Sequence, residues 1–324
     1  MKRFLIIGLG SIGRRHTRNL AALYPSATFT FLRRNGTADA LISDLNGRMI
    51  TALDDLDYDL IVLATPSALH IDLLPRLIQS GAALMIEKPI VTTLDDCDAI
   101  LAALDTAPDA VRVSGFNFRH IASLIQAQQM IANGRLGRII RASFKAGQWL
   151  PDWRPTQDYR EVYSGSIALG GGVELDLVHE LDVARWFFGE LDLKYAIGGQ
   201  LSQLEIESND VATMILAPPK GAPIVEVSLD YVSRQRVRRY EIVGELGTLI
   251  WDLSGTLELR EPNGKTTQID HAEGGFDVAA SYVDMMSRLM DAQTGAWPAH
   301  LQSLADGVIS SRIAIQARTK GNKQ

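Results

Sequence analysis

The chain has 324 residues, of which 46% are hydrophobic and 22% are charged, and its net charge at pH 7 is −6. This composition is typical of a soluble globular protein with a large core, and the length suggests two domains. The acidic balance argues against a nucleic-acid partner, which favours a basic surface. No apolar run is long enough to span a bilayer, and the N-terminus lacks a signal-peptide pattern. The chain has one cysteine, Cys97, which is typical of a protein in a reducing cytoplasm.

The first third of the chain alternates β-rich runs with helical segments. The predicted strands and helices are, in chain order, 4–8, 11–23, 27–32, 38–45, 59–65, 70–79, 82–87, 94–104 and 111–116, with a strand first and last. Continuous apolar strands that alternate with helices indicate a parallel sheet covered on both faces.

The rhythm changes after about residue 120. A helix is predicted over 121–132 and a long strand over 138–148, and several strands with turn signals follow in 194–270. Helices near 276–292 and 301–318 complete the chain. Successive strands without intervening helices indicate a largely antiparallel sheet. We therefore expect an α/β protein with domains at 1–119 and 120–324.

The sequence GLGSIG, Gly8–Gly13, lies where the first strand meets the first helix. Gly8 permits the tight turn, Gly10 lets the backbone approach a pyrophosphate, and Gly13 lets helix and strand pack closely. The helix N-terminus presents free N–H groups to the phosphate. A glycine-rich turn without a ligand is the alternative, but the strand–turn–helix context favours a dinucleotide.

The residues after the second strand bear on the choice of dinucleotide. A carboxylate about 20 residues after the glycine motif binds the ribose 2′-hydroxyl of NAD. Here Arg33 and Arg34 stand 20 and 21 residues after Gly13. Because a guanidinium binds a 2′-phosphate through two hydrogen bonds, we expect NADP(H) in preference to NAD(H). The alternative is that both arginines merely solvate the end of the strand.

Glu87, Lys88 and Pro89 follow the buried strand at 82–87. Ligands of open α/β sheets bind beyond the carboxyl ends of the strands. A lysine at this place can hydrogen-bond a substrate oxygen and stabilise negative charge on it. Glu87 is expected to pair with a lysine or an arginine. An exposed strand-end lysine without a ligand is the simpler alternative.

Several of these motifs together resemble one family. GLGSIG, ATPSALH (64–70), EKP (87–89), GFNFR (115–119) and GGG followed by a helix with Asp and His occur here in the order found in the Gfo/Idh/MocA oxidoreductases. These are the relatives of glucose–fructose oxidoreductase and inositol 2-dehydrogenase. The resemblance covers nearly the whole chain, and it is specific for the family but not for the substrate.

The resemblance implies an N-terminal Rossmann domain, with a doubly wound parallel sheet, and a C-terminal α/β domain with an open, mostly antiparallel sheet. That sheet often forms the oligomer interface, so a homodimer or homotetramer is expected. The resemblance also implies that Lys88 contacts the substrate and the nicotinamide region. With the motif residues above, the expected cofactor-binding set is Gly8, Gly10, Ser11, Ile12, Gly13, Arg33, Arg34, Thr65, Pro66, His70, Glu87, Lys88 and Asn117.

The segment 173–188 combines four acidic residues with one histidine. On a continuous helix its apolar face is Leu177, Leu181, Ala184 and Phe188. The opposite face carries Asp176, His179 and Asp182 at intervals of three residues. Flanking carboxylates suit a histidine that accepts a proton from a substrate hydroxyl. Glu174 and Glu180 are peripheral to this face. An amphipathic helix with a solvated acidic face is the alternative.

A metal site is not expected here, because Val183 stands where the second histidine of H-E-x-x-H would be. The family resemblance implies that His179 is the catalytic acid/base. Many family members have Asp-x-x-x-His, whereas here Leu175 stands four residues before His179 and Asp176 stands three before it. The sequence therefore leaves open whether Asp176 or Asp182 supports the histidine.

The irregular segment 147–165 contains Trp149, Trp153, Tyr159 and Tyr163 among charged residues. Aromatic faces with directional polar groups suit a carbohydrate, and long ordered loops tend to be functional. An arm that packs on a neighbouring subunit is the alternative. The expected substrate-binding set is Trp153, Arg154, Tyr163, Asp176 and His179.

A second charged stretch, RQRVRR at 234–239, would place Arg234, Arg236 and Arg238 on one face of a strand. We expect a solvated or interface face, with binding of an anionic substrate group as the alternative.

Together these features predict a dehydrogenase or reductase that transfers hydride between a nicotinamide and a carbinol or carbonyl carbon of a sugar, cyclitol or sugar derivative. Lys88, His179 and Asp176 are the candidate catalytic residues, and no metal is expected. A non-catalytic dinucleotide- and sugar-binding regulator of the same fold is the alternative. The sequence gives neither the substrate nor the direction of reaction.

Overall fold

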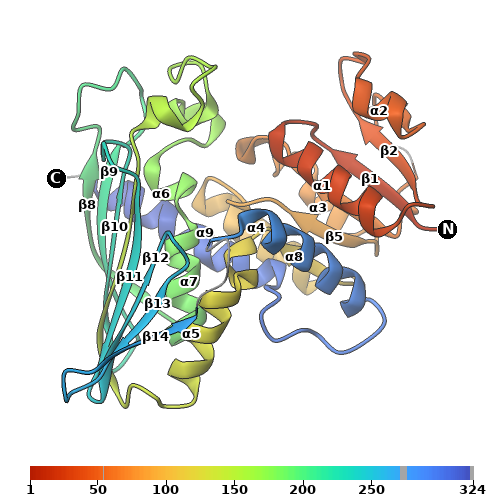
Figure 1. Cartoon of the computed structure of the whole chain (residues 1–324). Coiled ribbons are helices and arrows are strands. Elements are labelled where there is room, and N and C mark those ends of the chain that lie inside the picture. Colours follow the sequence, from red (N-terminus) through yellow and green to blue (C-terminus); the bar gives the residue numbers. More distant parts are fainter. Residues whose placement is uncertain (54, 271–275, 322–324) are drawn as a thin grey trace. The chain divides into compact units, whose positions relative to one another are not determined.

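The computed structural model describes residues 1–53, 55–270 and 276–321, and the chain divides into two compact units (Figure 1). The first unit contains residues 1–117 and 279–309, and the second contains 118–278 and 310–324. This division differs from the expected ranges 1–119 and 120–324, because the segment 279–309 returns to the first unit.

The first unit is built on a six-stranded sheet in which every pairing is parallel. The strand order is β3-β2-β1-β4-β5-β6. Since β1 pairs with both β2 and β4, the strand order reverses there, at the point where such sheets bind dinucleotides. The short strand β3 was not expected from the sequence. The bounds are β1 (Arg3–Ile7), β2 (Thr28–Leu32), β3 (Arg48–Ile50), β4 (Leu60–Leu63), β5 (Ala83–Ile86) and β6 (Arg112–Ser114).

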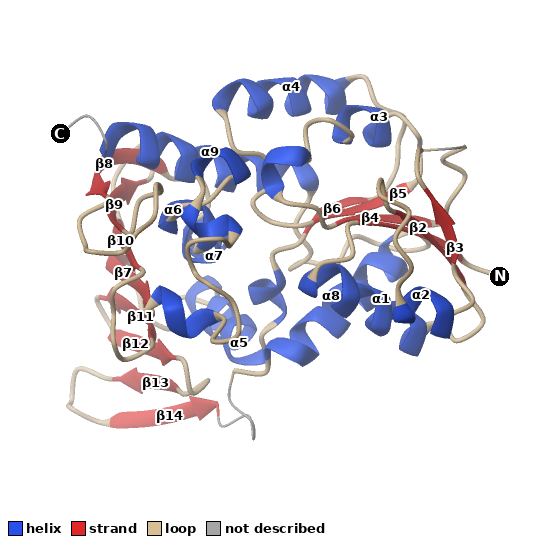
Figure 2. Cartoon of the chain, turned by 90° about the horizontal axis from the view of Figure 1, so that it is seen from above, coloured by secondary structure: helices blue, strands red, loops and turns tan. Residues whose placement is uncertain are grey.

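Helices cover both faces of this sheet, as predicted. Figure 2 shows α3 and α4 on one face and α1, α2 and α8 on the other. The helix α4 begins where Thr93 accepts a hydrogen bond from the backbone N–H of Asp96 at 3.1 Å, a standard N-cap. The bounds are α1 (Ser11–Leu23), α2 (Ala40–Asp44), α3 (Leu74–Ile78), α4 (Leu94–Asp105) and α8 (Val278–Ala292).

The second unit is built on an eight-stranded sheet with the order β14-β13-β12-β11-β7-β10-β9-β8. Among the described strands, β10 and β7 pair in parallel and all other neighbours are antiparallel. The predicted mostly antiparallel sheet is therefore confirmed. The bounds are β7 (Ile139–Gly147), β8 (Asp192–Gly199), β9 (Val211–Ala217), β10 (Ile224–Asp230), β11 (Val237–Gly244), β12 (Gly247–Asp252), β13 (Leu257–Arg260) and β14 (Thr266–Asp270).

The helices α5 (Ala122–Ala132), α6 (Val173–Asp176) and α7 (His179–Phe188) lie on one face of this sheet (Figure 1). The helix α9 (Leu304–Gly321) begins in the first unit and continues in the second from Ser310. Alternate residues of β9 and β10 point to the helices and are buried, which gives the period of two expected for a sheet with one covered face.

Candidate functional site

The glycine turn has the geometry of a phosphate cradle. Gly8 has φ +95°, and an added Cβ there would lie 2.5 Å from the carbonyl oxygen of Ala64. An added Cβ at Gly13 would overlap the carbonyl oxygen of Gly8, whereas at Gly10 it would meet nothing within 4 Å. The backbone of Gly10 therefore faces open space. This space lies at the start of α1, where no side chain caps the helix. Pyrophosphate oxygens and their charge fit this place.

The structure adds one candidate for binding the ribose of the dinucleotide near the end of β2. Arg33 donates to Asp39 at 2.9 Å, and Arg14 binds the same carboxylate through two nitrogens at 3.0 and 2.5 Å. The side chain of Asp39 is 6% exposed, and its hydrogen bonds with Arg14 lower the pKa of its carboxyl. Arg34 extends outward, with its side chain 72% exposed. Asp39 lies too far along the chain from Gly13 to match the usual spacing, so the sequence pattern missed it.

The loop after β4 contains Thr65, Pro66 and His70, which the resemblance placed near the cofactor. The ring of His70 is fully buried, with Nδ1 2.9 Å from the carbonyl oxygen of Ile90 and Nε2 3.1 Å from that of Thr65. Burial lowers the pKa of this imidazole. Because a neutral imidazole has a single N–H, the ring hydrogen-bonds one of these two carbonyl oxygens and lies against the other.

At the end of β5, Glu87 is buried and Lys88 is half-buried. Among the described residues, the ionisable partner of Glu87 is a histidine and not the expected lysine or arginine. Its Oε1 lies 2.6 Å from Nε2 of His16 on α1, and its Oε2 accepts the backbone N–H of Lys88 at 3.2 Å. The sequence missed His16 because nothing local shows that α1 passes the end of β5.

Asn117 was also expected at the cofactor. It is fully buried, and its Nδ2 donates to Oγ of Ser281 at 2.8 Å. Asn117 thus joins the end of the first segment of this unit to α8.

In the second unit, the predicted continuous helix over 173–188 is wrong. The segment forms α6 and α7, and Leu177 and Val178 lie in the turn between them. His179 is consequently the first residue of α7. The even spacing of Asp176, His179 and Asp182 along one helical face does not exist, because the helix axis is interrupted between the first two.

The alternative of a solvated acidic face does not apply, since all four acidic side chains of the segment are buried. Asp182 accepts two hydrogen bonds from Arg119, at 2.9 and 2.8 Å, and one from Ser310 at 3.1 Å. Glu180 lies 2.7 Å from Nε of Arg238 and accepts from Tyr240 at 2.8 Å. These carboxylates hold α7 to other elements of its unit.

The two acidic residues before His179 have different partners. Asp176 accepts a hydrogen bond from the hydroxyl of Tyr231 at 2.6 Å. Burial, and then the charge of Asp176, raise the pKa of that hydroxyl. Glu174 accepts from Nδ2 of Asn209 at 2.6 Å, and burial raises the pKa of its carboxyl.

His179 itself is 6% exposed and stacks on Phe118, with ring centroids 4.2 Å apart and planes 6° from parallel. The guanidinium of Arg238 also lies over Phe118, 4.6 Å from the ring centroid. An aromatic face fixes the plane of the imidazole, and a nearby guanidinium supplies positive charge to this part of the unit.

The loop 147–165 brings two of the expected substrate residues, Trp153 and Tyr163, close to Tyr231. The ring of Trp153 meets that of Tyr231 edge to face at 5.3 Å. Burial, and then Asp176, raise the pKa of the Tyr163 hydroxyl, so Tyr163 also faces this carboxylate. Tyr231 was missed because it lies at the end of an ordinary apolar strand, far along the chain from its partners.

Arg154 lies over the ring of Tyr163, 5.2 Å from the centroid. Both residues line an open cavity of about 520 Å³ with Asp158 and Glu161. The charged and hydroxyl groups around this cavity give it a polar lining.

The arginines of 234–239 do not form one solvated or interface face. The strand β11 begins only at Val237, and Arg234 stacks on Trp149 at 3.7 Å. Arg238 pairs with Glu180 of its own chain and is 12% exposed. The expected alternation fails because Arg234 and Arg236 precede the strand.

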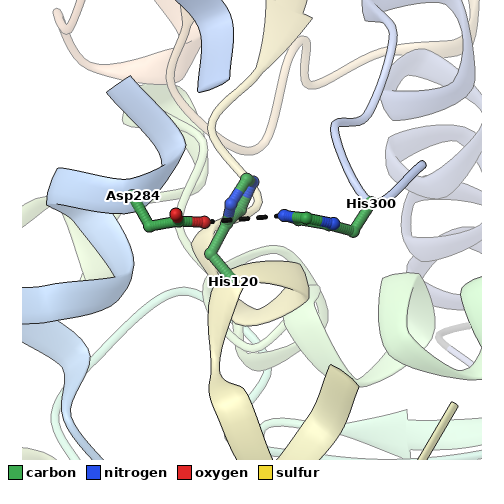
Figure 3. Close-up of side chains that lie close together, drawn as sticks. All are labelled: His120, Asp284 and His300. Carbon is green, nitrogen blue, oxygen red and sulfur yellow. Dashed lines mark ion pairs between the residues drawn. The ribbon is translucent and has the colours of Figure 1, made fainter. Parts of the chain in front are cut away.

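One histidine–carboxylate contact was not expected from the sequence. In the first unit, Nε2 of His300 lies 3.5 Å from Asp284, as the dashed line in Figure 3 shows. Asp284 also accepts from Arg288 at 3.3 Å. Nothing in the structure tests the expectation of no metal, which stays a prediction.

Two family models match the chain. Residues 2–114 match the oxidoreductase family with an NAD-binding Rossmann fold, and residues 124–250 match the GFO/IDH/MocA C-terminal domain. The chain belongs to the Gfo/Idh/MocA oxidoreductase family. The predicted family and α/β fold are confirmed, and the family description names NAD. The expected preference for NADP(H) stays a prediction.

Among curated family members, levoglucosan dehydrogenase of Pseudarthrobacter phenanthrenivorans is 25% identical over 64% of this chain, and the chain spans 59% of that relative. Inositol 2-dehydrogenase 2 of Saccharopolyspora erythraea is 24% identical over 95% of this chain and 87% of its own length. A solved levoglucosan dehydrogenase in complex with NADH and L-sorbose has a TM-score of 0.85 at 17% identity, and the match covers 100% of this chain and 97% of that one. This similarity shows the shared fold. In the described part of the chain, no helix combines the length and apolarity needed to cross a bilayer.

Proposed function

We propose that the protein is an NAD(P)-dependent oxidoreductase that transfers hydride between the nicotinamide and a carbinol or carbonyl carbon of a sugar, a cyclitol or a sugar derivative. The observation that carries the proposal is the open cradle at Gly10, in a chain whose family is an NAD-binding oxidoreductase family. Relatives named for levoglucosan and inositol support a polyhydroxylated substrate.

In this proposal the bound dinucleotide supplies the hydride donor or acceptor. The ammonium of Lys88 hydrogen-bonds the reacting oxygen and stabilises negative charge on it. His179 takes the proton from the substrate hydroxyl in oxidation and returns it in reduction. The stack on Phe118 holds the ring of His179 in a fixed plane.

Asp176 is proposed to support the site through hydrogen bonds with tyrosine hydroxyls. Its carboxylate accepts from Tyr231, and Tyr163 faces it. Asp182 is fully buried and bound by Arg119 and Ser310. Of the two carboxylates that the sequence left open, Asp176 is therefore the better candidate for a role at the site.

The substrate is proposed to contact the loop 147–165. Trp153 and Tyr163 offer aromatic faces, and Arg154 offers a guanidinium beside a polar cavity of about 520 Å³. Aromatic faces with directional hydrogen-bonding groups match the C–H surfaces and hydroxyls of a sugar.

Steady-state kinetics test the proposal, with absorbance of the reduced nicotinamide as readout and a panel of sugars and inositols as substrates. We expect Lys88→Ala and His179→Ala each to lower kcat/KM by about 10²- to 10⁴-fold, the range for loss of acid–base catalysis. Lys145→Ala, which removes an exposed lysine of β7, is the matched control and keeps wild-type turnover. Full turnover of either site variant would refute its assigned role.

The same assay addresses the alternative of a non-catalytic regulator. That alternative predicts a dinucleotide that binds and a sugar that changes its affinity, without any change in nicotinamide absorbance. Turnover with any member of the panel excludes it.

The preference for NADP(H) rests on Arg34, which extends outward beside the end of β2, and on Arg33. Asp39 opposes this preference, because a carboxylate repels a 2′-phosphate and accepts from a 2′-hydroxyl. We expect Arg34→Ala to weaken binding of NADPH more than binding of NADH. Wild-type protein that binds NADH more tightly would overturn the preference.

We further propose a homodimer or homotetramer formed through the second sheet, in a reducing cytoplasm. The sheet face away from α5, α6 and α7 exposes apolar side chains, among them Tyr195 and Ile197 at 48% and Ile224 at 59%. Apolar patches of this kind mark protein interfaces. Light scattering tests this proposal: Ile197→Lys should lower the mass to that of the monomer.

A further inference from the structure

A buried histidine links the phosphate-binding helix to the strand that carries Lys88. His16 lies on α1 and Glu87 directly follows β5, and the Nε2–Oε1 distance of 2.6 Å is that of a strong hydrogen bond. The His16 side chain is fully buried and that of Glu87 is 7% exposed. Water therefore does not compete for this bond.

The geometry at His16 favours one tautomer. Among the described residues, its Nδ1 has no hydrogen-bond partner, so Glu87 is the polar group that the ring serves. A carboxylate accepts hydrogen bonds, which places the proton on Nε2. Tyr282 packs edge-on against the ring at 5.5 Å and fixes its plane.

Glu87 connects the ring of His16 to the backbone of Lys88. Its Oε2 accepts the backbone N–H of Lys88 at 3.2 Å, so the two carboxylate oxygens contact the histidine and the lysine peptide, respectively. An added Cβ at Gly115 would lie 3.1 Å from Oε1 of Glu87, so this glycine makes room for the carboxylate. On the other side of Lys88, His70 lies against the carbonyl oxygen of Ile90.

We propose that His16 is a positioning residue for Lys88: through Glu87 it fixes the peptide from which the lysine extends and ties that peptide to the helix of the phosphate cradle. The inference rests on the proposed role of Lys88. Reacting groups lose efficiency steeply when they are displaced by about 1 Å, so a residue that holds Lys88 in place affects turnover without touching the substrate.

The test compares His16→Leu, which removes the donor, with His16→Gln, whose amide can donate to Glu87. His16→Leu should lower kcat by about 10²-fold, the cost of a displacement of about 1 Å, while the Kd for the dinucleotide stays near that of the wild type. His16→Gln should restore most of the turnover. Thr17→Val is the matched control, because it changes a buried position of α1 that bonds to Gly13 rather than to Glu87, and it should keep wild-type kcat.

A double-mutant cycle with Lys88 separates positioning from general structural damage. If His16 acts through Lys88, adding His16→Leu to Lys88→Ala causes no further loss, whereas adding it to His179→Ala causes its full loss. If the fold-losses of turnover caused by His16→Leu and Lys88→Ala multiply in the double variant, the inference is overturned. A His16→Leu variant whose turnover is unchanged would also overturn it.

A second readout does not depend on activity. The amide resonance of Lys88 in protein labelled with ¹⁵N and free of dinucleotide should move in His16→Leu and return toward the wild-type position in His16→Gln. An unmoved resonance would overturn the link. If His16→Leu does not fold, His16→Gln is compared with Glu87→Gln, which keeps an acceptor but loses the charge; wild-type turnover and an unmoved Lys88 amide in Glu87→Gln would then refute the inference.

These outcomes are distinct from failure of the proposed function. If Lys88→Ala alone keeps full turnover, the catalytic role of Lys88 fails, and with it the positioning role of His16. If Lys88→Ala loses turnover while His16 and Lys88 act independently, the proposed function stands and the inference fails.

Discussion

The two units bury ionisable side chains in different ways. Near Lys88 in the first unit, two buried histidines contact a neighbouring carboxylate and the backbone carbonyls of Thr65 and Ile90. In the second unit, four carboxylates of one segment, 173–188, are buried against partners far along the chain. The first arrangement fixes the backbone on both sides of Lys88. The second joins two short helices to their own unit, so acidic residues there serve as structural links.

The largest expected effect is on the second unit, where Asp182 and Arg119 form a buried ion pair. Asp182→Asn should lower the free energy of unfolding by about 3–5 kcal/mol, because it leaves the Arg119 guanidinium without its charged partner. Urea unfolding measures the change. The control is Arg260→Met, which breaks an exposed pair with Glu258 and should cost at most about 1 kcal/mol. Equal unfolding midpoints for Asp182→Asn and the wild type would show that the pair does not hold α7.

Substitution of two glycines of the first unit should have smaller effects, on stability at one position and on dinucleotide affinity at the other. Gly13→Ala places a Cβ against the carbonyl of Gly8 and should cost about 1–3 kcal/mol of stability, as overpacking does. Gly10→Ala meets no atom within 4 Å, so its stability should stay near that of the wild type while its affinity for the dinucleotide falls. Unfolding curves and dinucleotide titrations on the same samples test both. Unchanged affinity in Gly10→Ala would argue against the cradle.

Substitution of two glutamates of the second unit by glutamine should change the unfolding midpoint in opposite directions. Burial raises the folded-state pKa of Glu174 above 4.5, so the unfolded chain binds fewer protons and stability falls as pH rises through this window. Glu174→Gln removes that loss and should equal or exceed the wild type in unfolding midpoint at neutral pH. Glu180→Gln should lower the midpoint, because it leaves Arg238 without its charge partner. A wild type that gains stability relative to Glu174→Gln as pH rises from 4.5 to neutral would reverse the assigned direction.

The smallest expected effect is a pH dependence in the first unit. Burial lowers the folded-state pKa of His70 below 6.5, so the unfolded state binds more protons as the solution is acidified through this window. The wild type should lose more stability than His70→Gln as pH falls from 6.5. Thermal unfolding gives the midpoint of each protein at each pH. The difference between the two midpoints removes the contribution of the titratable groups that both proteins share. A constant difference across this range would contradict the direction.

Much of the fold followed from local patterns. The alternating strands and helices of the first third gave the parallel sheet, and successive strands after residue 190 gave the antiparallel one. The exceptions have physical causes. The helix over 173–188 was predicted as continuous because its apolar residues keep a helical period through Leu177 and Val178, although the chain turns there.

The candidate site was predicted only where the residues lie close together in the chain. The glycine turn and Lys88 fall within local motifs, and their roles stay proposals. The partners His16, Asp39 and Tyr231 were missed, because their roles come from elements that meet only in the folded unit. The alternative of a solvated acidic face fails for the same reason: charge alone favours solvent, and the partners that permit burial lie elsewhere in the sequence.

The return of residues 279–309 to the first unit has a consequence for synthesis on the ribosome. Tyr282 of this segment packs against His16, Ser281 binds Asn117, and Val113 forms a bridge with Ser303. The first unit therefore cannot complete its core until almost the whole chain has been translated, although its strands emerge first. The second unit includes the residues from Ser310 on, so it too is completed only at the end of the chain. The first unit, whose strands emerge first, therefore waits longest with an incomplete core, and it is the part that depends most on protection from aggregation.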